Sequence, residues 1–236
     1  MTYVYATDGG ALVTEHVMIP GPPDLEGLYE APGGSIQGGA VVAHPHPLYG
    51  GDMTQPVVHH TARACRSRGL ATLRFNFRGV GGSRGTYDGS EEWSDVQAAG
   101  RFLAGRLGPE RPLVLAGYSF GAAMALLAAM HGTHADALVL VAFPLAWEGL
   151  SPSAFDGGHA VATPVLSLCG ADDDIAPPAE VEAFLVRQGL HATQVVLPGT
   201  DHFFLGRQEA VEEAVARFLG DVPALRRASV RGEREL

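Results

Sequence analysis

The feature that most constrains the fold of this chain is its repeated alternation of short apolar runs with helical segments. Six runs rich in Val, Leu and Ala have the length of buried strands, at 38–45, 70–77, 111–119, 136–144, 163–170 and 193–199. Segments with apolar residues at helical spacing lie at 54–69, 90–108, 120–132, 178–189 and 207–220. Continuous apolar strands alternating with helices predict an α/β fold, with a mostly parallel sheet covered on both faces.

The beginning of the chain follows a different pattern. Two short strands, 11–19 and 25–30, flank a Pro/Gly-rich turn, which predicts a hairpin at one edge of the sheet. No linker or internal repeat divides the rest of the chain. We therefore expect a single domain over 1–220 and a polar, Arg-rich tail over 221–236.

Two helix ends carry recognisable signals. Gly69 follows the helical segment 54–69 as a plausible C-cap, because glycine accepts the left-handed conformation that ends many helices. Ser90 precedes an acidic first turn, and we expect it to cap the next helix.

Composition excludes several classes of function. Hydrophobic residues make up 46% of the chain and the formal net charge is −10, which fits a globular protein and argues against binding to nucleic acid. No apolar run approaches the length of a membrane span, and the first residues show no secretory signal. Cys65 and Cys169 both lie in apolar segments, which favours buried thiols in a reducing compartment. We expect a cytoplasmic protein that does not bind membranes.

The motif that indicates chemistry is Gly117-Tyr118-Ser119-Phe120-Gly121, a G-x-S-x-G sequence between a predicted strand and a predicted helix. A sharp turn at this point strains the serine backbone and exposes its hydroxyl beside the helix N-terminus. The flanking glycines leave room for the turn, and the helix dipole favours a developing oxyanion. Ser119 is therefore the predicted nucleophile.

A serine hydroxyl needs a base, and the base needs an orienting acid. In this architecture the acid and then the histidine follow the serine, each on a loop after a later strand. His202 lies after the last predicted strand, and Asp172, Asp173 and Asp174 lie after the one before it. His202 is the predicted base, and one of the three aspartates is its partner.

Five ordered segments resemble the α/β-hydrolase superfamily, and more narrowly its small cap-less serine hydrolases of the dienelactone-hydrolase-like branch. They read "AHPHPLYGGDM", "LRFNFRGVGGSRGTYDGSEEWSDVQAA", "GYSFG", "GADDDIAPP" and "GTDHFF", between about residues 25 and 219. The resemblance implies a central sheet of about eight strands with a minimal cap or none. Its G-x-x-D pattern selects Asp173 as the acid, although the triple aspartate departs from the family and leaves Asp172 as an alternative.

The loop "HPHPLYGG" contains two histidines that suggest a metal site, but no third ligand clusters with them in the sequence. We predict neither metal nor cofactor, and we expect His44 and His46 to hydrogen-bond backbone groups of neighbouring loops. Aligning His46-Pro47 with the family's His-Gly makes the N–H of Leu48 one oxyanion donor, and the N–H of Phe120 supplies the other.

The remaining candidates surround this site. Tyr118, Trp147 and Phe204 are predicted to line the substrate pocket, with local packing as the alternative for Tyr118 and Phe204. We expect Arg78 and Arg84, in a Gly-rich loop, to form structural or rim ion pairs rather than bind a substrate carboxylate. About twenty residues join the strands on either side of Trp147, too few for a multi-helix cap, so the site should be open and edged by Trp147 and Phe155.

The sequence thus predicts a serine hydrolase that cleaves carboxylic esters of a small-molecule acyl substrate, with thioesters or lactones as variants of the same chemistry. A biosynthetic cyclase or acyltransferase with the same triad remains an alternative, as does a non-catalytic binding relative. A peptidase is disfavoured because the chain has no room for a substrate-selecting cap. A homodimer is left open, and the physiological substrate is not encoded in any motif.

Overall fold

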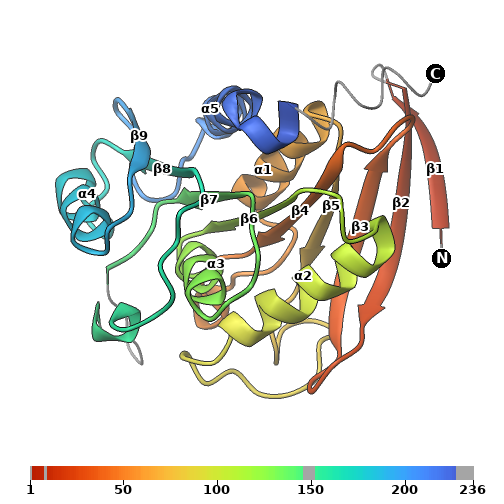
Figure 1. Ribbon diagram of the computed structural model, residues 1–236, viewed down its shortest axis with the longest axis horizontal. Helices are drawn as coiled ribbons and strands as arrows, with labels where there is room; N and C mark the ends of the chain where they lie inside the picture. Colours follow the sequence, from red (N-terminus) through yellow and green to blue (C-terminus); the bar gives the residue numbers. More distant parts are fainter. Residues whose placement is uncertain (1, 8–9, 146–151, 227–236) are drawn as a thin grey trace.

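The computed structural model describes residues 2–7, 10–145 and 152–226. Over these residues, nine strands form one sheet in the order β1-β2-β3-β5-β4-β6-β7-β8-β9 (Figure 1). The strands are β1 (Thr2–Thr7), β2 (Gly10–Ile19), β3 (Leu25–Pro32), β4 (Gly38–Ala43), β5 (Leu70–Phe75), β6 (Leu113–Tyr118), β7 (Ala137–Val141), β8 (Val165–Gly170) and β9 (Ala192–Leu197). The six predicted apolar runs form the parallel part, from β5 to β9, and β1 to β3 join it antiparallel. The α/β prediction is confirmed.

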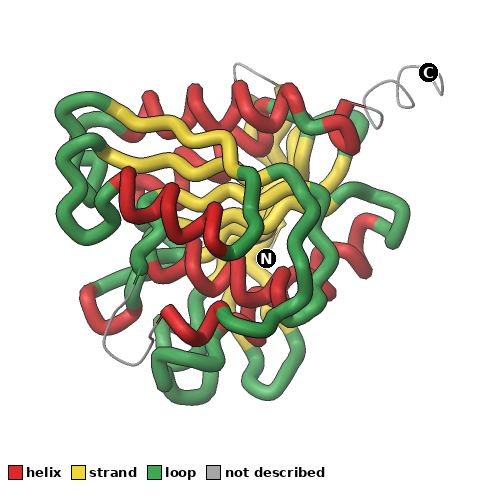
Figure 2. Tube along the Cα trace, turned by 60° about the vertical axis from the view of Figure 1, so that its left-hand side comes forward, coloured by secondary structure: helices red, strands yellow, loops and turns green. Residues whose placement is uncertain are grey.

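Helices cover both faces of this sheet (Figures 1 and 2). They are α1 (Pro56–Ser67), α2 (Trp93–Leu107), α3 (Phe120–Met130), α4 (Pro178–Arg187) and α5 (Gln208–Asp221), with short 3-10 turns η1 (Pro47–Tyr49) and η2 (Pro152–Phe155). Apolar side chains of α1 and α5 pack in one hydrophobic cluster, and those of α2, α3 and α4 pack in the other. The sheet therefore separates two cores, as both-face burial of its parallel strands requires.

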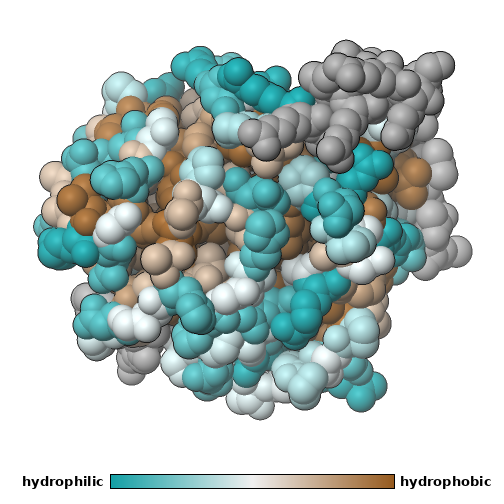
Figure 3. Space-filling model, in the orientation of Figure 1, coloured by the Kyte–Doolittle hydropathy of each residue, from teal (hydrophilic) through white to brown (hydrophobic). Residues whose placement is uncertain are grey.

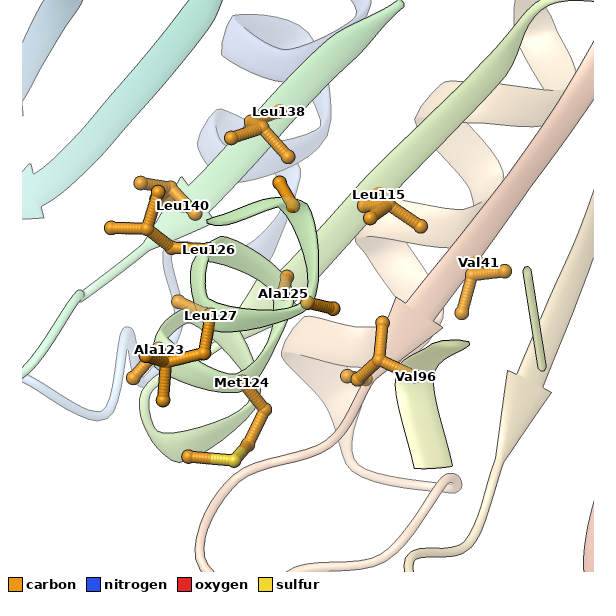
Figure 4. Packing of buried hydrophobic residues seen from close by; sticks show 14 of the residues in the cluster. Val41, Val96, Leu115, Ala123, Met124, Ala125, Leu126, Leu127, Leu138 and Leu140 are labelled. Atoms are coloured by element: carbon orange, nitrogen blue, oxygen red, sulfur yellow. The ribbon is translucent and has the colours of Figure 1, made fainter. Parts of the chain in front are cut away.

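Helix α3 forms the centre of the larger core. Every residue from Phe120 to Met130 is buried, which explains why this helix is apolar on all sides. In Figure 4 its side chains lie near Leu115 of β6, Leu138 of β7 and Val96 of α2, and Val41 of β4, on the far side of Val96, belongs to the same cluster. This packing holds the N-terminus of α3 rigidly at the end of β6.

The secondary structure and the domain boundary differ from the sequence predictions at three places. Strand β1 was not predicted, and it extends the antiparallel edge by pairing with β2. Ser90 is not the N-cap of α2, which begins at Trp93. The Asp88 carboxylate instead accepts hydrogen bonds from the N–H groups of Ser90 and Glu91, at 2.8 and 2.9 Å, so these residues form a turn before the helix.

The third difference concerns the end of the domain. Val222 and Leu225 are buried in the core formed with α1 and α5, so the chain continues to pack beyond residue 220. Residues 227–236 of the expected tail lie outside the described residues.

The surface carries both hydrophilic and apolar side chains. Figure 3 shows mostly hydrophilic residues over α2, with apolar residues gathered toward α4 and β9, the elements that carry the exposed Val186 and Val196. Among the described residues, none of the helices is long and apolar enough to span a bilayer.

Candidate active site

Ser119 stands at the turn between β6 and α3. Its backbone has φ 53° and ψ −121°, a strained conformation for a residue with a side chain. The glycines of the motif make the turn possible, because an added Cβ at Gly117 would lie 2.1 Å from the carbonyl oxygen of Gly121. At Gly121 a Cβ would lie 2.5 Å from the Ala43 oxygen and 2.6 Å from that of His44. The first turn of α3 thus packs directly on the end of β4.

His202 and Asp173 extend from the loops after β9 and β8 to meet the serine. The Nε2 atom of His202 lies 2.9 Å from Ser119 Oγ, and its Nδ1 lies 2.8 Å from Asp173 Oδ2. Since a carboxylate accepts only, Nδ1 carries the proton and Nε2 is free to accept one from the serine. The parallel strands therefore bring together all three residues predicted as the triad.

The triple aspartate resolves into one buried and two exposed side chains. Asp173 is 3% exposed, whereas Asp172 and Asp174 face solvent. The Oδ1 atom of Asp173 also accepts the N–H groups of Ile175 and Ala176, at 3.0 and 2.7 Å. Three donors therefore fix this carboxylate beside His202, and the structure selects it over its neighbours.

Tyr118 lies next to the nucleophile and supports the histidine loop. Its hydroxyl donates a 2.9 Å hydrogen bond to the carbonyl oxygen of His202. Burial, reinforced by the charges of Asp173 and Asp201, raises the pKa of Tyr118 well above its ordinary value. The phenol therefore stays protonated and keeps this donor in place. Tyr118 also lines the pocket described below, as predicted.

His44 links the loop after β4 to the loop after β5. Its Nδ1 lies 2.6 Å from the carbonyl oxygen of Pro45, and its Nε2 accepts the N–H of Phe77 at 3.0 Å. Nδ1 is therefore the protonated nitrogen. Burial lowers the pKa of His44 to about 4, so the ring is neutral near pH 7. The expectation that His44 bonds backbone groups of neighbouring loops is confirmed.

His46 has the opposite tautomer. Its Nδ1 accepts the N–H of Leu48 at 3.3 Å, so Nε2 carries the proton and lies 2.8 Å from the Tyr87 hydroxyl. Burial lowers the pKa of His46, which favours this neutral ring. Tyr87 comes from the Gly-rich loop after β5, so His46 connects that loop to the pocket wall.

The structure contradicts the expectation that Leu48 supplies an oxyanion donor. Its N–H points to His46 Nδ1, its side chain is 71% exposed, and it does not line the pocket of Ser119. The physical reason is the position of the strand end: β4 stops at Ala43, so Leu48 already lies within η1 (Pro47–Tyr49), whose geometry turns its N–H to the His46 side chain. Among the described residues, the N–H of His46 has no hydrogen-bond partner, and His46 does line the pocket.

A pocket of about 530 Å³ opens beside the serine. Its lining combines Ser119 and His202 with mainly apolar and aromatic neighbours, namely Pro45, His46, Tyr49, Gln55, Tyr118, Phe120, Pro144, Ile175 and Phe203. Tyr49, Ile175 and Phe203 were not predicted as pocket residues, although each lies within one of the quoted motif segments. They are neighbours of the motif residues along the chain.

Two other pocket predictions are corrected. Phe204 is fully buried against Tyr118 in the core, because its backbone turns at φ 52° and leaves Phe203 on the pocket side. Phe155 is also fully buried, packed on Phe143 and Phe184, so it does not edge the site. Trp147 lies outside the described residues.

The Gly-rich loop is held by ion pairs rather than open to substrate. Arg78 contacts the buried Asp95 at 2.6 Å, as predicted for a structural ion pair, and Arg84 is 3.9 Å from Asp24 at the surface.

Cys65 and Cys169 are both free and buried, and burial raises the pKa of the Cys65 thiol to about 12. Within the described ranges, no three His, Cys, Asp or Glu side chains cluster closely enough to hold a metal ion.

Comparison with known proteins identifies relatives of this chain. A family model described as an alpha/beta hydrolase domain matches residues 40–218. An uncharacterized protein of Rickettsia prowazekii is 30% identical over 186 residues, which cover 76% of this chain and 77% of that protein. An alpha-beta serine hydrolase homologue from Coxiella burnetii is similar in structure, with a TM-score of 0.78, 36% identity, and coverage of 87% of this chain and 97% of that one. A serine hydrolase without a lid from Xanthomonas campestris has a TM-score of 0.74, 28% identity and coverage of 94% and 95%.

Proposed function

Because this chain belongs to the α/β-hydrolase superfamily as a member without a cap, and is a hydrolase, we propose that it cleaves carboxylic esters with Ser119 as nucleophile. The observation that carries this proposal is the continuous hydrogen-bond chain from Ser119 Oγ through His202 to Asp173. The serine stands on a strained turn at the mouth of an apolar pocket. This arrangement suits attack on an acyl carbon.

In the first half of the reaction, Ser119 Oγ attacks the ester carbonyl while His202 Nε2 takes its proton. The Asp173 carboxylate keeps the proton on Nδ1 and stabilises the imidazolium that forms. His202 then returns the proton to the leaving alkoxide, and the acyl group remains on Ser119. In the second half, His202 takes a proton from a water molecule that attacks this ester, and it gives the proton to Ser119 Oγ as the bond to the acyl carbon breaks and the free acid leaves.

The oxyanion that forms twice in this cycle needs backbone donors. We assign them to the N–H of Phe120, the first residue of α3, and the N–H of His46 in the loop that packs against it. Pro45 and Pro47 have no N–H, and the Leu48 N–H is directed to a side chain. The close contact of Gly121 with the end of β4 supports the assignment, because it brings these two segments together.

The alternative activities that the sequence leaves open would give different products from an ester hydrolase. A cyclase or acyltransferase would use the same acyl-enzyme but exclude water and deliver the acyl group to another nucleophile. The pocket is open to solvent at exposed side chains such as Tyr49 and Phe203, which favours hydrolysis. A non-catalytic relative would not retain the geometry of the complete triad.

The decisive experiment is labelling of the folded protein with a fluorophosphonate probe, followed by turnover of p-nitrophenyl esters from acetate to decanoate. We expect a covalent adduct on Ser119 and stoichiometric release of free acid. Ser119→Ala should remove both, with a loss of several orders of magnitude in kcat/KM. A wild-type protein that folds but is neither labelled nor active would refute the proposal. Transfer of the acyl group to an added alcohol without acid release would support the acyltransferase.

A further inference from the structure

The mouth of the pocket carries an unusual concentration of exposed apolar side chains. Among the described residues, the large hydrophobic side chains that face solvent are Met18, Leu48, Tyr49, Ile175, Val186, Val196, Phe203 and Leu205. Five of these eight come from the three loops around the site, and we call Leu48, Tyr49, Ile175, Phe203 and Leu205 the apolar rim. Single exposed hydrophobic residues are ordinary, but a cluster around a pocket indicates a binding surface.

The rim is apolar like the pocket lining, and the two share residues. Tyr49, Ile175 and Phe203 belong to both, with exposed fractions of 81%, 48% and 64%. Leu48 directly precedes Tyr49 and is 71% exposed. Leu205 is two residues after Phe203 and is 84% exposed. Tyr49, Ile175 and Phe203 therefore carry the apolar lining of the pocket out to the surface, and Leu48 and Leu205 are exposed on the same loops.

Charged side chains are absent from the described pocket lining, and those next to the rim in sequence are mainly carboxylates. The residues that line the pocket include no Asp, Glu, Lys or Arg within the described chain. Asp174 directly precedes Ile175, and Asp201 directly precedes His202; both carboxylates are exposed. Arg207, the nearest arginine in sequence to Leu205, donates to the Pro198 carbonyl oxygen and the Thr200 hydroxyl. Among the described residues next to the rim in sequence, an anionic group would meet the exposed carboxylates of Asp174 and Asp201, while the guanidinium of Arg207 is directed to Pro198 and Thr200, which is unfavourable.

We propose that the apolar rim binds the acyl part of an uncharged, hydrophobic ester, and that the enzyme discriminates against acyl groups with a terminal carboxylate. This inference rests on the ester hydrolysis proposed above, because it names the acyl group that reaches Ser119. The carbonyl lies in the pocket, and an acyl chain too long for it lies across the rim. Burial of each methylene against the rim adds to binding, whereas a carboxylate loses its hydration without gaining a partner.

The first test compares two monomeric substrates of equal length, p-nitrophenyl hexanoate and the mono-p-nitrophenyl ester of adipic acid. They differ only in the terminal group of the acyl chain. We expect kcat/KM to be at least about tenfold higher for the hexanoate, because the carboxylate must approach the rim unpaired. A smaller difference, or a preference for the adipate, overturns the inference.

The second test removes the rim itself. In Phe203→Ser/Leu205→Ser, we expect the ratio of kcat/KM for p-nitrophenyl octanoate to that for the acetate to fall about tenfold. Met18→Ser is the matched control: Met18 is 51% exposed on β2, which three strands separate from β6 in the sheet. The control should keep the wild-type ratio. An unchanged ratio in the rim variant, or an equal fall in the control, refutes the rim as a binding surface.

The two proposals fail in different ways. If Ser119 is not labelled by the fluorophosphonate and no ester is cleaved, the proposed function itself is wrong. If Ser119 is labelled and the acetate is cleaved but the two substrate ratios do not respond, only the rim inference is wrong.

Discussion

The Nδ1 atom of His44 lies 2.6 Å from the carbonyl oxygen of Pro45, the next residue in the chain. That carbonyl shares a planar trans peptide with the N–H of His46, so the two bond vectors point in opposite directions. By holding the oxygen, His44 fixes the direction of the N–H that we assign to the oxyanion. A buried histidine outside the triad is thus expected to act through the geometry of its neighbour.

We predict that His44→Gln lowers kcat by about 10- to 100-fold while KM changes little, because a misdirected donor weakens the transition state more than the bound substrate. His44→Asn should lose less, since its shorter amide keeps a donor near the Pro45 oxygen. The measurement is steady-state turnover of p-nitrophenyl butyrate, together with the affinity of an alkyl boronic acid, which should fall in parallel with kcat. Wild-type kcat in a folded His44→Gln protein would contradict this role.

The same burial has a consequence for stability. Desolvation lowers the pKa of His44 from 6.5 to about 4, although its bond to Pro45 and the charge of Asp52 oppose the shift. Between these pH values the unfolded chain binds a proton that the folded chain does not, so the free energy of unfolding falls as pH falls. The contribution is fully present above pH 6.5, and about 3 kcal/mol of it is lost by pH 4.

Urea unfolding at pH 7, 5 and 4 can measure this effect. The loss of stability on acidification should be about 3 kcal/mol smaller in His44→Gln than in the wild type, because glutamine does not titrate. Other groups titrate in both proteins and cancel in the difference. If the two proteins lose the same free energy across this range, His44 is not the neutral buried group that the structure shows.

Sequence was sufficient to predict that Ser119, Asp173 and His202 meet at one site, because the constraints on their positions are topological. The strand-to-helix turn at Ser119 and the order serine, acid, histidine are readable from apolar runs and glycines alone. Parallel strands then bring the three loops to one edge of the sheet. The choice of Asp173 among three consecutive aspartates needed the G-x-x-D pattern of the family resemblance, and in the structure Asp173 is the buried one of the three.

Sequence was not sufficient to assign a role where two similar residues or pairs of residues are adjacent in the chain. His-Pro occurs twice in succession, at His44 and His46, and only the end of β4 decides which pair begins the loop. Phe203 and Phe204 present the same problem, because the turn at Phe204 determines which ring enters the core. The ring in the core is shifted by one residue from the prediction, and the oxyanion donor that we propose is shifted by two; both depend on backbone conformation rather than on residue type.

The triple aspartate allows a matched set of substitutions. Asp173→Asn should reduce kcat by about 10⁴-fold, because the amide leaves His202 without its carboxylate and favours the wrong tautomer. Asp172→Asn and Asp174→Asn remove the same charge from exposed positions one residue away and should retain more than half of the activity. Turnover of p-nitrophenyl butyrate by the three variants measures this. Near-full activity in Asp173→Asn with loss in Asp172→Asn would transfer the acid role to Asp172.

The contact between α3 and the end of β4 can be tested with two glycines. Gly121→Ala places a methyl group about 2.5 Å from the backbone oxygens of Ala43 and His44, so the loop of His46 must move away from the helix. We expect a loss of about 3 kcal/mol in stability from overpacking. We also expect a fall of at least about tenfold in kcat, because the two oxyanion donors separate.

Gly105→Ala is the matched control for this substitution. Gly105 is an exposed residue of α2 with no atom within 4 Å of its added Cβ, so alanine should stabilise the helix by about 1 kcal/mol and leave kcat unchanged. Thermal unfolding and ester turnover of both variants distinguish a specific contact from a general effect of replacing glycine. A Gly121→Ala protein as stable and active as the Gly105→Ala protein would show that the end of β4 does not depend on its contact with α3.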